Sequence, residues 1–326
     1  RLKTEDSFGR QEGFATVGLG WIIISAIGAL PFFISGIVPT YTDAFFETMS
    51  GFTTTGATIL TVIEGLPRGL LFWRSLTHWL GGMGIIMLSL AVFSFLRKGS
   101  FLFQAEVPGP TPDRILPRLK QTAMVLWIIY GGLSLMEILA LNAAGMSLYE
   151  SFIHTFGTMA TGGFSSRDLS VKAFDNPLIE TIICIFMILA GLNFALYYRM
   201  LRKKSIKTFF LDPEARAYLG IIGIATIIIT VSLTTKMNLS VVNAFRKAVF
   251  QVVSIVTTTG FSSDNFDLWP PLCKGILFVL MFIGGCTGST GGSIKVARVV
   301  LLFKYAKRRI RQVTRPRLGL QTKLGN

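Results

Sequence analysis

The sequence predicts an all-α membrane protein built from tandem repeats that cross the membrane in the same direction. Three observations support this fold class. Apolar residues make up 51% of the 326 residues and charged residues only 15%, whereas soluble domains carry about 25% charged residues. A hydroxyl-rich turn centred on glycine recurs three times along the chain. Lysine and arginine gather between the repeats, as they do in the cytoplasmic loops of membrane proteins.

The recurring turn is short, uncharged and rich in threonine. Its three copies align on Gly56, Gly163 and Gly260, at spacings of 107 and 97 residues. Each copy follows a short segment of mixed polarity and is flanked by longer apolar runs. This order is typical of a re-entrant segment between two membrane spans. The turns therefore predict tandem repeats of span, re-entrant helix with filter loop, and span.

We expect the first repeat to comprise residues 1–96. Residues 13–37 are apolar over about the length needed to cross a bilayer, so they form the first span. Residues 43–50 are too short and too polar to cross, and they form a half-depth helix that ends at the turn. Residues 69–96 form the second span, in which the glycines between Trp79 and Ile85 allow close helix packing.

The second and third repeats follow the same plan over residues 97–207 and 208–314. In the second repeat, the predicted span, half helix and span are residues 122–145, 149–156 and 177–200. In the third repeat, they are residues 215–235, residues 241–255 and a span from residue 271 onward. Residues 315–326 form a polar connector towards a missing fourth repeat.

The distribution of positive charge predicts how the repeats are oriented. Of the 32 lysine and arginine residues, 23 lie in the N-terminal tail, in the connectors between repeats or in the C-terminal segment. Cytoplasmic loops are enriched in these residues, so every connector between repeats is expected on the cytoplasmic side. All repeats then point the same way, and the turns open to the outside. This pattern argues against an inverted-repeat transporter.

The turns have the chemistry of a filter for a monovalent cation. Backbone carbonyls can replace the water around a dehydrated cation, and glycine permits the conformation that aims them at one axis. The preceding half helix directs the negative end of its dipole towards the ion. No charged side chain lies within the three turns, whereas calcium sites usually contain carboxylates. The candidate filter residues are Thr54, Thr55, Gly56, Thr161, Gly162, Gly163, Thr258, Thr259 and Gly260.

Three acidic residues follow the glycines at short distances. Glu64, Asp168 and Asp264 would raise the local cation concentration if they surround the outer entrance. It is equally possible that these three acids only lie on a solvated loop surface and have no role in transport.

A second glycine-rich segment interrupts the last predicted span. Five glycines and small hydroxyl residues lie between apolar runs, and each glycine costs a helix about 1 kcal/mol relative to alanine. We therefore expect an unwound loop in the middle of the membrane, which is tolerated only where it is buried or lines water. Below the filter it would act as a gate. The candidate gate residues are Gly284, Gly285, Cys286, Thr287, Gly288, Ser289, Thr290, Gly291, Gly292 and Lys295.

The sequence resembles the Trk/Ktr/HKT superfamily of potassium translocation proteins, most closely its bacterial Trk branch. The resemblance rests on the repeat plan, on Trp79 to Ile85, on Ala160 to Ser165, and on the glycine-rich segment with Lys295. It implies potassium uptake through four filter segments around a pseudo-fourfold axis, gated by the intramembrane loop. It also implies a multi-pass protein of the bacterial inner membrane that forms a homodimer and is controlled by a cytosolic, nucleotide-binding, TrkA-like regulatory subunit. Potassium is then bound at the filter, and no organic cofactor is expected.

The chain departs from this family in having three repeats where the family has four. Three filter segments leave one side of the ion site open, and an open pore wall in lipid is costly. We therefore expect the chain to be part of a longer protein and not to conduct selectively by itself.

Two alternatives to channel-like uptake remain open from the sequence. One is symport of potassium with sodium or protons, for which Glu137, Glu180 and His154 could form a relay or could be paired structural groups. The other is a membrane anchor for a cytosolic regulator, supported by the basic residues 304–317. These residues could equally be a positive-inside flank or a site for anionic membrane lipid.

Other functions are not supported by the sequence. The net charge of +15 is spread between apolar segments and forms no basic face of a polar domain, so nucleic-acid binding is not expected. The glycine-rich segment does not match a phosphate-binding loop. The sequence shows no nucleophile-base pair and no metal-ligand cluster, so an enzyme is the least expected function. The three cysteines are an odd number, and small packing residues are the better explanation for them.

Overall fold

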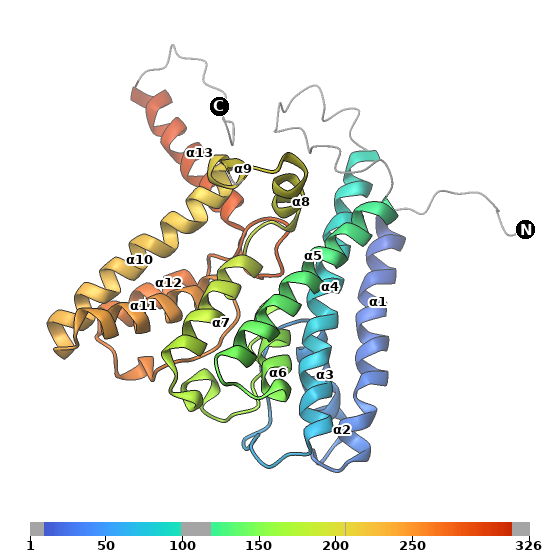
Figure 1. Ribbon diagram of the computed structural model, residues 1–326. Coiled ribbons are helices and arrows are strands. Elements are labelled where there is room, and N and C mark those ends of the chain that lie inside the picture. Colours follow the sequence, from blue (N-terminus) through green and yellow to red (C-terminus); the bar gives the residue numbers. More distant parts are fainter. Residues whose placement is uncertain (1–9, 99–118, 206, 315–326) are drawn as a thin grey trace, which may run out of the picture.

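The computed structural model describes residues 10–98, 119–205 and 207–314, which are helical and contain no named β-strand (Figure 1). The all-α prediction is confirmed for these residues. The helices of the predicted first repeat are α1 (Arg10–Gly28), α2 (Leu30–Ile34), α3 (Tyr41–Phe52) and α4 (Arg68–Lys98). Those of the second are α5 (Leu119–Ala143), α6 (Leu148–Met159), the 3-10 helix η1 (Ser170–Phe174), α7 (Pro177–Ala190) and α8 (Phe194–Lys203). Helix α9 (Lys207–Leu211) leads to α10 (Pro213–Met237), α11 (Val241–Val256), the 3-10 helix η2 (Phe266–Leu268), α12 (Pro271–Leu280) and α13 (Val296–Thr314).

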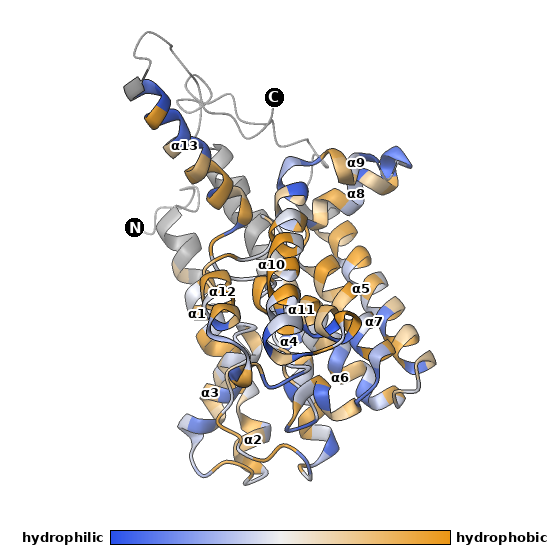
Figure 2. Ribbon diagram, turned by 90° about the vertical axis from the view of Figure 1, so that its left-hand side faces the viewer, coloured by the Kyte–Doolittle hydropathy of each residue, from blue (hydrophilic) through white to orange (hydrophobic). Residues whose placement is uncertain are grey.

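The described helices fit a multi-pass membrane protein. Three segments are long and apolar enough to cross a bilayer, namely Val17–Ile34, Ala123–Ala143 and Pro213–Met237, and α7 with α8 makes a fourth if that bent pair is one span. Large apolar side chains are exposed along the outer faces of α1, α5 and α10, as expected of surfaces that contact lipid. Hydrophilic residues gather towards the far end of α13 and around α8 and α9 (Figure 2).

Short helices lie at the three positions where the sequence predicts half-depth helices. Thr40, Ser147 and Ser240 cap α3, α6 and α11, each accepting a hydrogen bond from the backbone N–H three residues later. Each short helix packs against the first span of its own repeat. Helix α6 also packs against α4, and α11 packs against α7. The short helices therefore join neighbouring repeats as well as their own.

One predicted span is wrong. Residues 177–200 were expected to form a single helix, but α7 and α8 are bent by 89° relative to each other. The break falls at Gly191, where a side chain would meet the hydroxyl of Tyr218, and at Asn193, whose side chain accepts the N–H of Ala195 and starts α8. We call residues 191–193 the elbow.

Two other predicted spans are also interrupted. The stretch predicted over residues 13–37 is divided at Ala29 into α1 and α2, because Pro31 lies in the first turn of α2 and cannot continue the α1 hydrogen-bond ladder. The last span stops after Leu280 and resumes at Val296, which leaves the glycine-rich segment outside any helix. The connector at 315–326 and most of 97–120 lie outside the described residues.

Candidate cation pathway

The three turns that follow α3, α6 and α11 have the same backbone conformation. Two residues in each turn have positive φ angles, and they occupy equivalent positions. The φ angles are 54° at Thr54, 53° at Thr161 and 60° at Thr258, then 75° at Gly56, 82° at Gly163 and 84° at Gly260. A positive φ at threonine costs roughly 1–2 kcal/mol, so its presence in all three turns indicates a conformation imposed by the surroundings.

The hydrogen bonds of the turns also repeat. The residue before each central glycine donates its N–H to a carbonyl five residues earlier at 2.9 Å, which joins Thr55 to Ser50, Gly162 to Gly157 and Thr259 to Ser254. The N–H groups are thus directed back to the ends of the short helices. The carbonyls of Thr54, Thr55, Thr258 and Thr259 accept no hydrogen bond from the described residues. They are available as ligands for a cation.

Neighbouring turns contact each other through their glycines. A methyl group on Gly56 would overlap the carbonyl oxygen of Gly162, and one on Gly163 would overlap that of Thr259. No described atom lies within 4 Å of the place that a methyl group on Gly260 would take. The first turn therefore touches the second and the second touches the third, while Gly260 has no such contact with any described residue.

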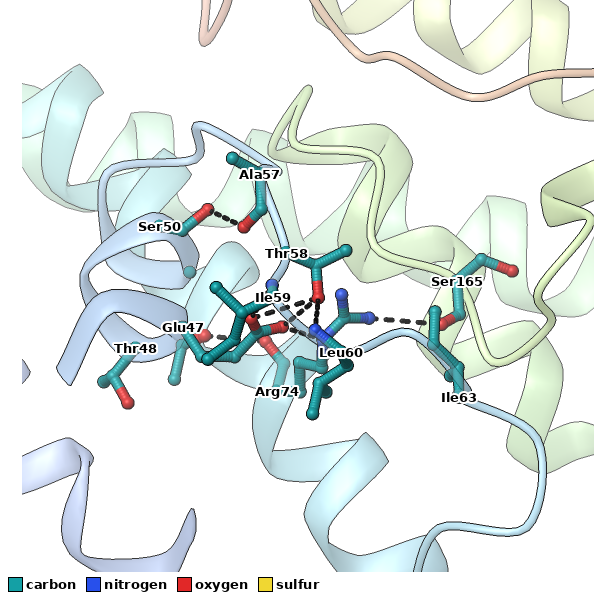
Figure 3. Close-up of polar contacts among 12 residues, drawn as sticks. Glu47, Thr48, Ser50, Ala57, Thr58, Ile59, Leu60, Ile63, Arg74 and Ser165 are labelled. Atoms are coloured by element: carbon teal, nitrogen blue, oxygen red, sulfur yellow. Dashed lines mark hydrogen bonds and ion pairs between the residues drawn. The ribbon is translucent and has the colours of Figure 1, made fainter. Parts of the chain in front are cut away.

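A buried ion pair fixes the chain after the first turn (Figure 3). Arg74 Nε of α4 donates to Glu47 Oε1 of α3 at 2.6 Å, and both side chains are almost fully buried. Glu47 also accepts hydrogen bonds from Thr58 Oγ1 at 2.8 and 3.0 Å and from the N–H of Ile59 at 3.1 Å. Arg74 Nη1 reaches across to the carbonyl of Ser165 in the second repeat at 3.2 Å. The pair therefore joins two repeats directly behind the turns.

The same helix supports the second turn through an aromatic ring. The Phe164 ring centroid lies 3.4 Å from the guanidinium carbon of Arg74 and 3.9 Å from the His78 ring, which is almost parallel to it. Two groups at such distances cannot share one face, so they lie on opposite faces of the ring. His78 Nδ1 also lies 2.8 Å from the carbonyl oxygen of Gly51.

The glycines between Trp79 and Ile85 have the packing role that we expected. A methyl group on Gly81 would overlap the backbone of Phe52, and one on Gly82 would lie 2.8 Å from the Cα of Ala160. Helix α4 can therefore approach the start of two turns at once.

Residues 281–295 form a non-helical segment beneath the turns and contact the third turn. The N–H of Gly292 donates to Thr258 Oγ1 at 2.7 Å, and a methyl group on Gly291 would lie 3.0 Å from the Thr257 carbonyl oxygen. The Lys295 ammonium donates to the carbonyl of Gly291. A cavity of about 250 Å³ separates the segment from the turns, lined by Thr53, Thr54, Thr55, Thr258, Thr290, Gly291, Gly292 and Ser293.

The elbow between α7 and α8 is the other support of this segment, and the sequence analysis missed it. The N–H of Cys286 donates to the carbonyl of Gly191 at 2.8 Å, and that of Phe194 donates to the carbonyl of Gly288 at 3.1 Å. The hydroxyl of Thr290 donates to Ala190 at 3.3 Å. Two helix breaks from different repeats thus meet and satisfy each other's backbone groups. Gly191 and Asn193 are the only local signals of the elbow in the sequence.

The three acidic residues beyond the turns differ in their contacts. Asp168 is exposed and accepts the N–H of Ile63 at 2.6 Å. Asp264 is partly buried and accepts hydrogen bonds from Lys247 Nζ at 2.8 Å and from the Trp269 indole at 3.1 Å. Glu64 is exposed. Asp168 and Asp264 thus have structural contacts, whether or not they also attract cations.

The ionisable residues of the predicted spans are mostly paired. Glu180 of α7 forms an ion pair with Arg246 at 3.5 Å, and His154 of α6 lies 3.0 Å from Ser165 Oγ and 2.8 Å from the Glu150 carbonyl. Glu137 of α5 is fully buried, and its carboxylate oxygens have no hydrogen-bond partner among the described residues. The described part of the chain contains no cluster of three His, Cys, Asp or Glu residues that could hold a metal ion.

Comparisons with known proteins agree on one family. The chain matches the family TrkH, described as "Cation transport protein", over residues 2–324. It is 43% identical over 320 residues to the Trk system potassium uptake protein TrkH of Escherichia coli K12 and 40% identical over 318 residues to that of Halomonas elongata. Each alignment covers 97% of this chain and 66% of the relative, so the chain spans about two thirds of the length of these relatives.

A solved structure has the same fold. The crystal structure of the potassium transporter TrkH from Vibrio parahaemolyticus matches with a TM-score of 0.89 and 35% identity. The match covers 99% of this chain and 67% of the solved chain.

Proposed function

Because the chain belongs to the TrkH family of cation transport proteins, we propose that it carries potassium across the membrane through a pathway lined by the three turns. The observation that carries this proposal is the repeated backbone geometry of residues 54–56, 161–163 and 258–260. Adjacent turns with unbonded carbonyls can surround an ion with oxygen ligands that carry no net charge. The ends of three helices add the negative ends of their dipoles.

We further propose that these turns are three segments of a pseudo-fourfold filter. Gly56 and Gly163 each meet a carbonyl of the following turn, whereas Gly260 meets none among the described residues. A fourth turn placed beside Gly260 would repeat the same contact and close the ring around the ion.

In this proposal the segment 284–293, with Lys295, is the gate. Two features support this role. The segment lies directly under the third turn, and its five glycines permit backbone conformations that other residues disfavour. A cation leaving the filter enters the cavity bounded by Thr290 and Ser293 and has to pass this segment.

The proposed setting follows the relatives, whose names place them in a Trk system for potassium uptake. We propose a homodimer in the bacterial inner membrane, controlled by a cytosolic nucleotide-binding subunit of the TrkA-like kind. The basic end of α13 faces the side on which such a subunit would lie, since cytoplasmic segments carry the positive charges.

Symport of potassium with protons is the second candidate, and Glu137 is the observation that favours it. A fully buried carboxyl group without a partner is strongly disfavoured as a charge, so it can hold and release a proton. A membrane anchor without transport is the third candidate, and the basic helix α13 fits it equally well.

Ion flux into liposomes distinguishes these functions. The purified full-length protein is reconstituted with and without its cytosolic regulator, and uptake of potassium and of sodium is measured in the presence and absence of a pH gradient. A potassium-selective flux that needs no second ion supports the channel. A flux that requires protons or sodium supports symport. The absence of flux under every condition would overturn the transport proposal and leave the anchor.

A further inference from the structure

A buried glutamate joins two parts of the molecule that the transport proposal treats separately. Glu214 lies in the first turn of α10 and is 8% exposed. Its Oε1 atom accepts three hydrogen bonds. The donors are the N–H of Thr287 at 2.6 Å, the hydroxyl of Thr287 at 3.0 Å and the N–H of Ala297 at 3.2 Å.

These donors belong to different elements. Thr287 lies in the middle of the intramembrane segment, whereas Ala297 lies in the first turn of α13. The N–H groups at the start of a helix have no partner within the helix, and the helix dipole favours a negative group there. The carboxylate of Glu214 therefore caps α13 and holds the segment with the same oxygen atom. If α13 shifts, the hydrogen bonds to Thr287 shift with it or break.

Glu214 is itself fixed in place. Asp212 caps α10 by accepting the N–H groups of Glu214 and Ala215, both at 3.0 Å. Asp212 also forms an ion pair with Arg199 of α8 at 3.4 Å. Helix α8 begins directly after the elbow on which the segment rests. The carboxylate is thus anchored to the second repeat while it holds the segment and α13 of the third.

We propose that Glu214 is a positioning residue that couples α13 to the intramembrane segment. Helix α13 runs away from the body of the molecule beyond the segment (Figure 1), and Leu302 and Phe303 on it are exposed. A cytosolic protein that binds and displaces α13 would therefore act on the segment through Glu214. This inference rests on the proposed function, because the segment has to be the gate.

The test compares variants that differ only in their ability to accept these hydrogen bonds. Glu214→Ala removes the acceptor, whereas Glu214→Gln keeps an oxygen in its place. Glu150→Ala is the control, because it removes an ion-paired carboxylate from the first turn of α6, away from the segment. Potassium flux is measured in liposomes with the full-length protein, with and without the cytosolic regulator. In parallel, maleimide labelling of Cys286 is measured after all other cysteines have been replaced by serine.

We expect Glu214→Ala to raise regulator-free flux and the rate of Cys286 labelling by about tenfold, since hydrogen bonds to charged groups are among the stronger ones. For Glu214→Gln, the flux and the labelling rate should stay within about threefold of the parental values, because the amide oxygen still accepts hydrogen bonds, although more weakly than a carboxylate. Cys286 is buried in the parent, so faster labelling reports release of the segment independently of transport. Thr287→Val removes only the hydroxyl donor and should also raise the flux and the labelling rate. It provides the test if Glu214→Ala does not fold.

The outcomes separate this inference from the function on which it rests. A parent that transports potassium normally, with Glu214→Ala and Thr287→Val at parental flux and labelling, overturns the coupling and leaves the transport proposal intact. A parent without potassium flux overturns the transport proposal, and the labelling of Cys286 then still shows whether Glu214 holds the segment. An equal rise in flux for Glu150→Ala would also contradict a specific role of Glu214.

Discussion

Gly56 of the first turn lies directly against the carbonyl oxygen of Gly162 in the second, and no side chain fits between them. The same relationship joins Gly163 to Thr259. The position of each set of carbonyls is therefore determined by the turn beside it. Selectivity in such a ring depends on these contacts as well as on the conformation of each turn.

We predict that Gly56→Ala lowers the preference of the full-length protein for potassium over sodium. The methyl group would overlap Gly162 and push the adjacent carbonyls apart, in addition to the roughly 1–2 kcal/mol that a left-handed conformation costs alanine. The ratio of potassium to sodium flux in liposomes measures the effect.

Gly65→Ala is the matched control for this experiment. Gly65 also has a positive φ, of 98°, but no described atom lies within 4 Å of the place that a methyl group on it would take. The substitution should lower stability slightly and leave the flux ratio unchanged. Equal effects of the two substitutions on selectivity would show that backbone strain, and not contact between turns, is responsible.

A second prediction concerns the buried pair of Glu47 and Arg74. Arg74→Ala should destabilise the protein by about 3–5 kcal/mol, because it leaves an uncompensated buried carboxylate. The double variant Glu47→Gln with Arg74→Met should recover part of this loss, since no buried charge remains. The midpoint of thermal unfolding in detergent, followed by size-exclusion chromatography, measures both changes.

The partly exposed pair of Glu150 and Arg167 provides the comparison. Its members lie 2.6 Å apart, but 42% of the arginine side chain is exposed. Arg167→Ala should cost no more than about 1 kcal/mol, as is usual for a pair screened by solvent. If both arginine variants lower the midpoint by the same amount, burial is not what makes the Glu47 pair important.

Much of the fold could be predicted from the sequence because its signals are local. Apolar length, the Thr and Gly turns and the short mixed segments depend on neighbouring residues, and the structure contains short helices and turns at those positions. The elbow was missed because residues 177–200 are mostly apolar over the length of a span, and nothing local shows that Gly191 meets Tyr218. An apolar run predicts burial or lipid contact but not whether the helix continues.

The supporting side chains could not be predicted for a different reason. Glu47 and Arg74 are separated by 27 residues, and Glu214 and Thr287 by 73. Such pairs form only after the helices have packed, and a single sequence does not indicate which acid meets which donor. The candidate filter residues could be named because the repeat marks them, and the candidate gate because a run of glycines marks it. The residues that hold them in place have no such local mark.

A third prediction concerns pH and the loop between α11 and α12. Burial raises the pKa of the Asp264 carboxyl, but the hydrogen bonds from Lys247 and Trp269 outweigh this effect and hold the pKa below its usual value. The charged form therefore stabilises the fold above the unfolded pKa of about 3.9, and this contribution is lost as the pH falls through the lower folded pKa.

Asp264→Asn should accordingly lower the unfolding midpoint at neutral pH, and the difference from the parent should shrink as the pH falls below about 4. Glu64→Gln is the control, because Glu64 is an exposed acid. Thermal unfolding at a series of pH values tests this. A difference between parent and Asp264→Asn that stays constant down to pH 3 would mean that the packing of the residue matters and its charge does not.

The last prediction concerns Lys295 and the exit from the proposed filter. Its ammonium group donates to the carbonyl of Gly291, which lies beneath Thr257 at the start of the third turn. A positive charge 4 Å from a cation opposes it by roughly 4 kcal/mol at an effective dielectric constant of 20. Lys295→Met should therefore raise potassium flux in the absence of the regulator, by about tenfold if a third of that energy acts on the ion. Lys295→Arg should stay near the parent, because it keeps the charge. Lys274→Met is the matched control, since Lys274 likewise donates to a backbone carbonyl, that of Asp267, but far from the segment. Parental flux in Lys295→Met, or an equal rise in Lys274→Met, would show that the charge of Lys295 does not restrict the exit.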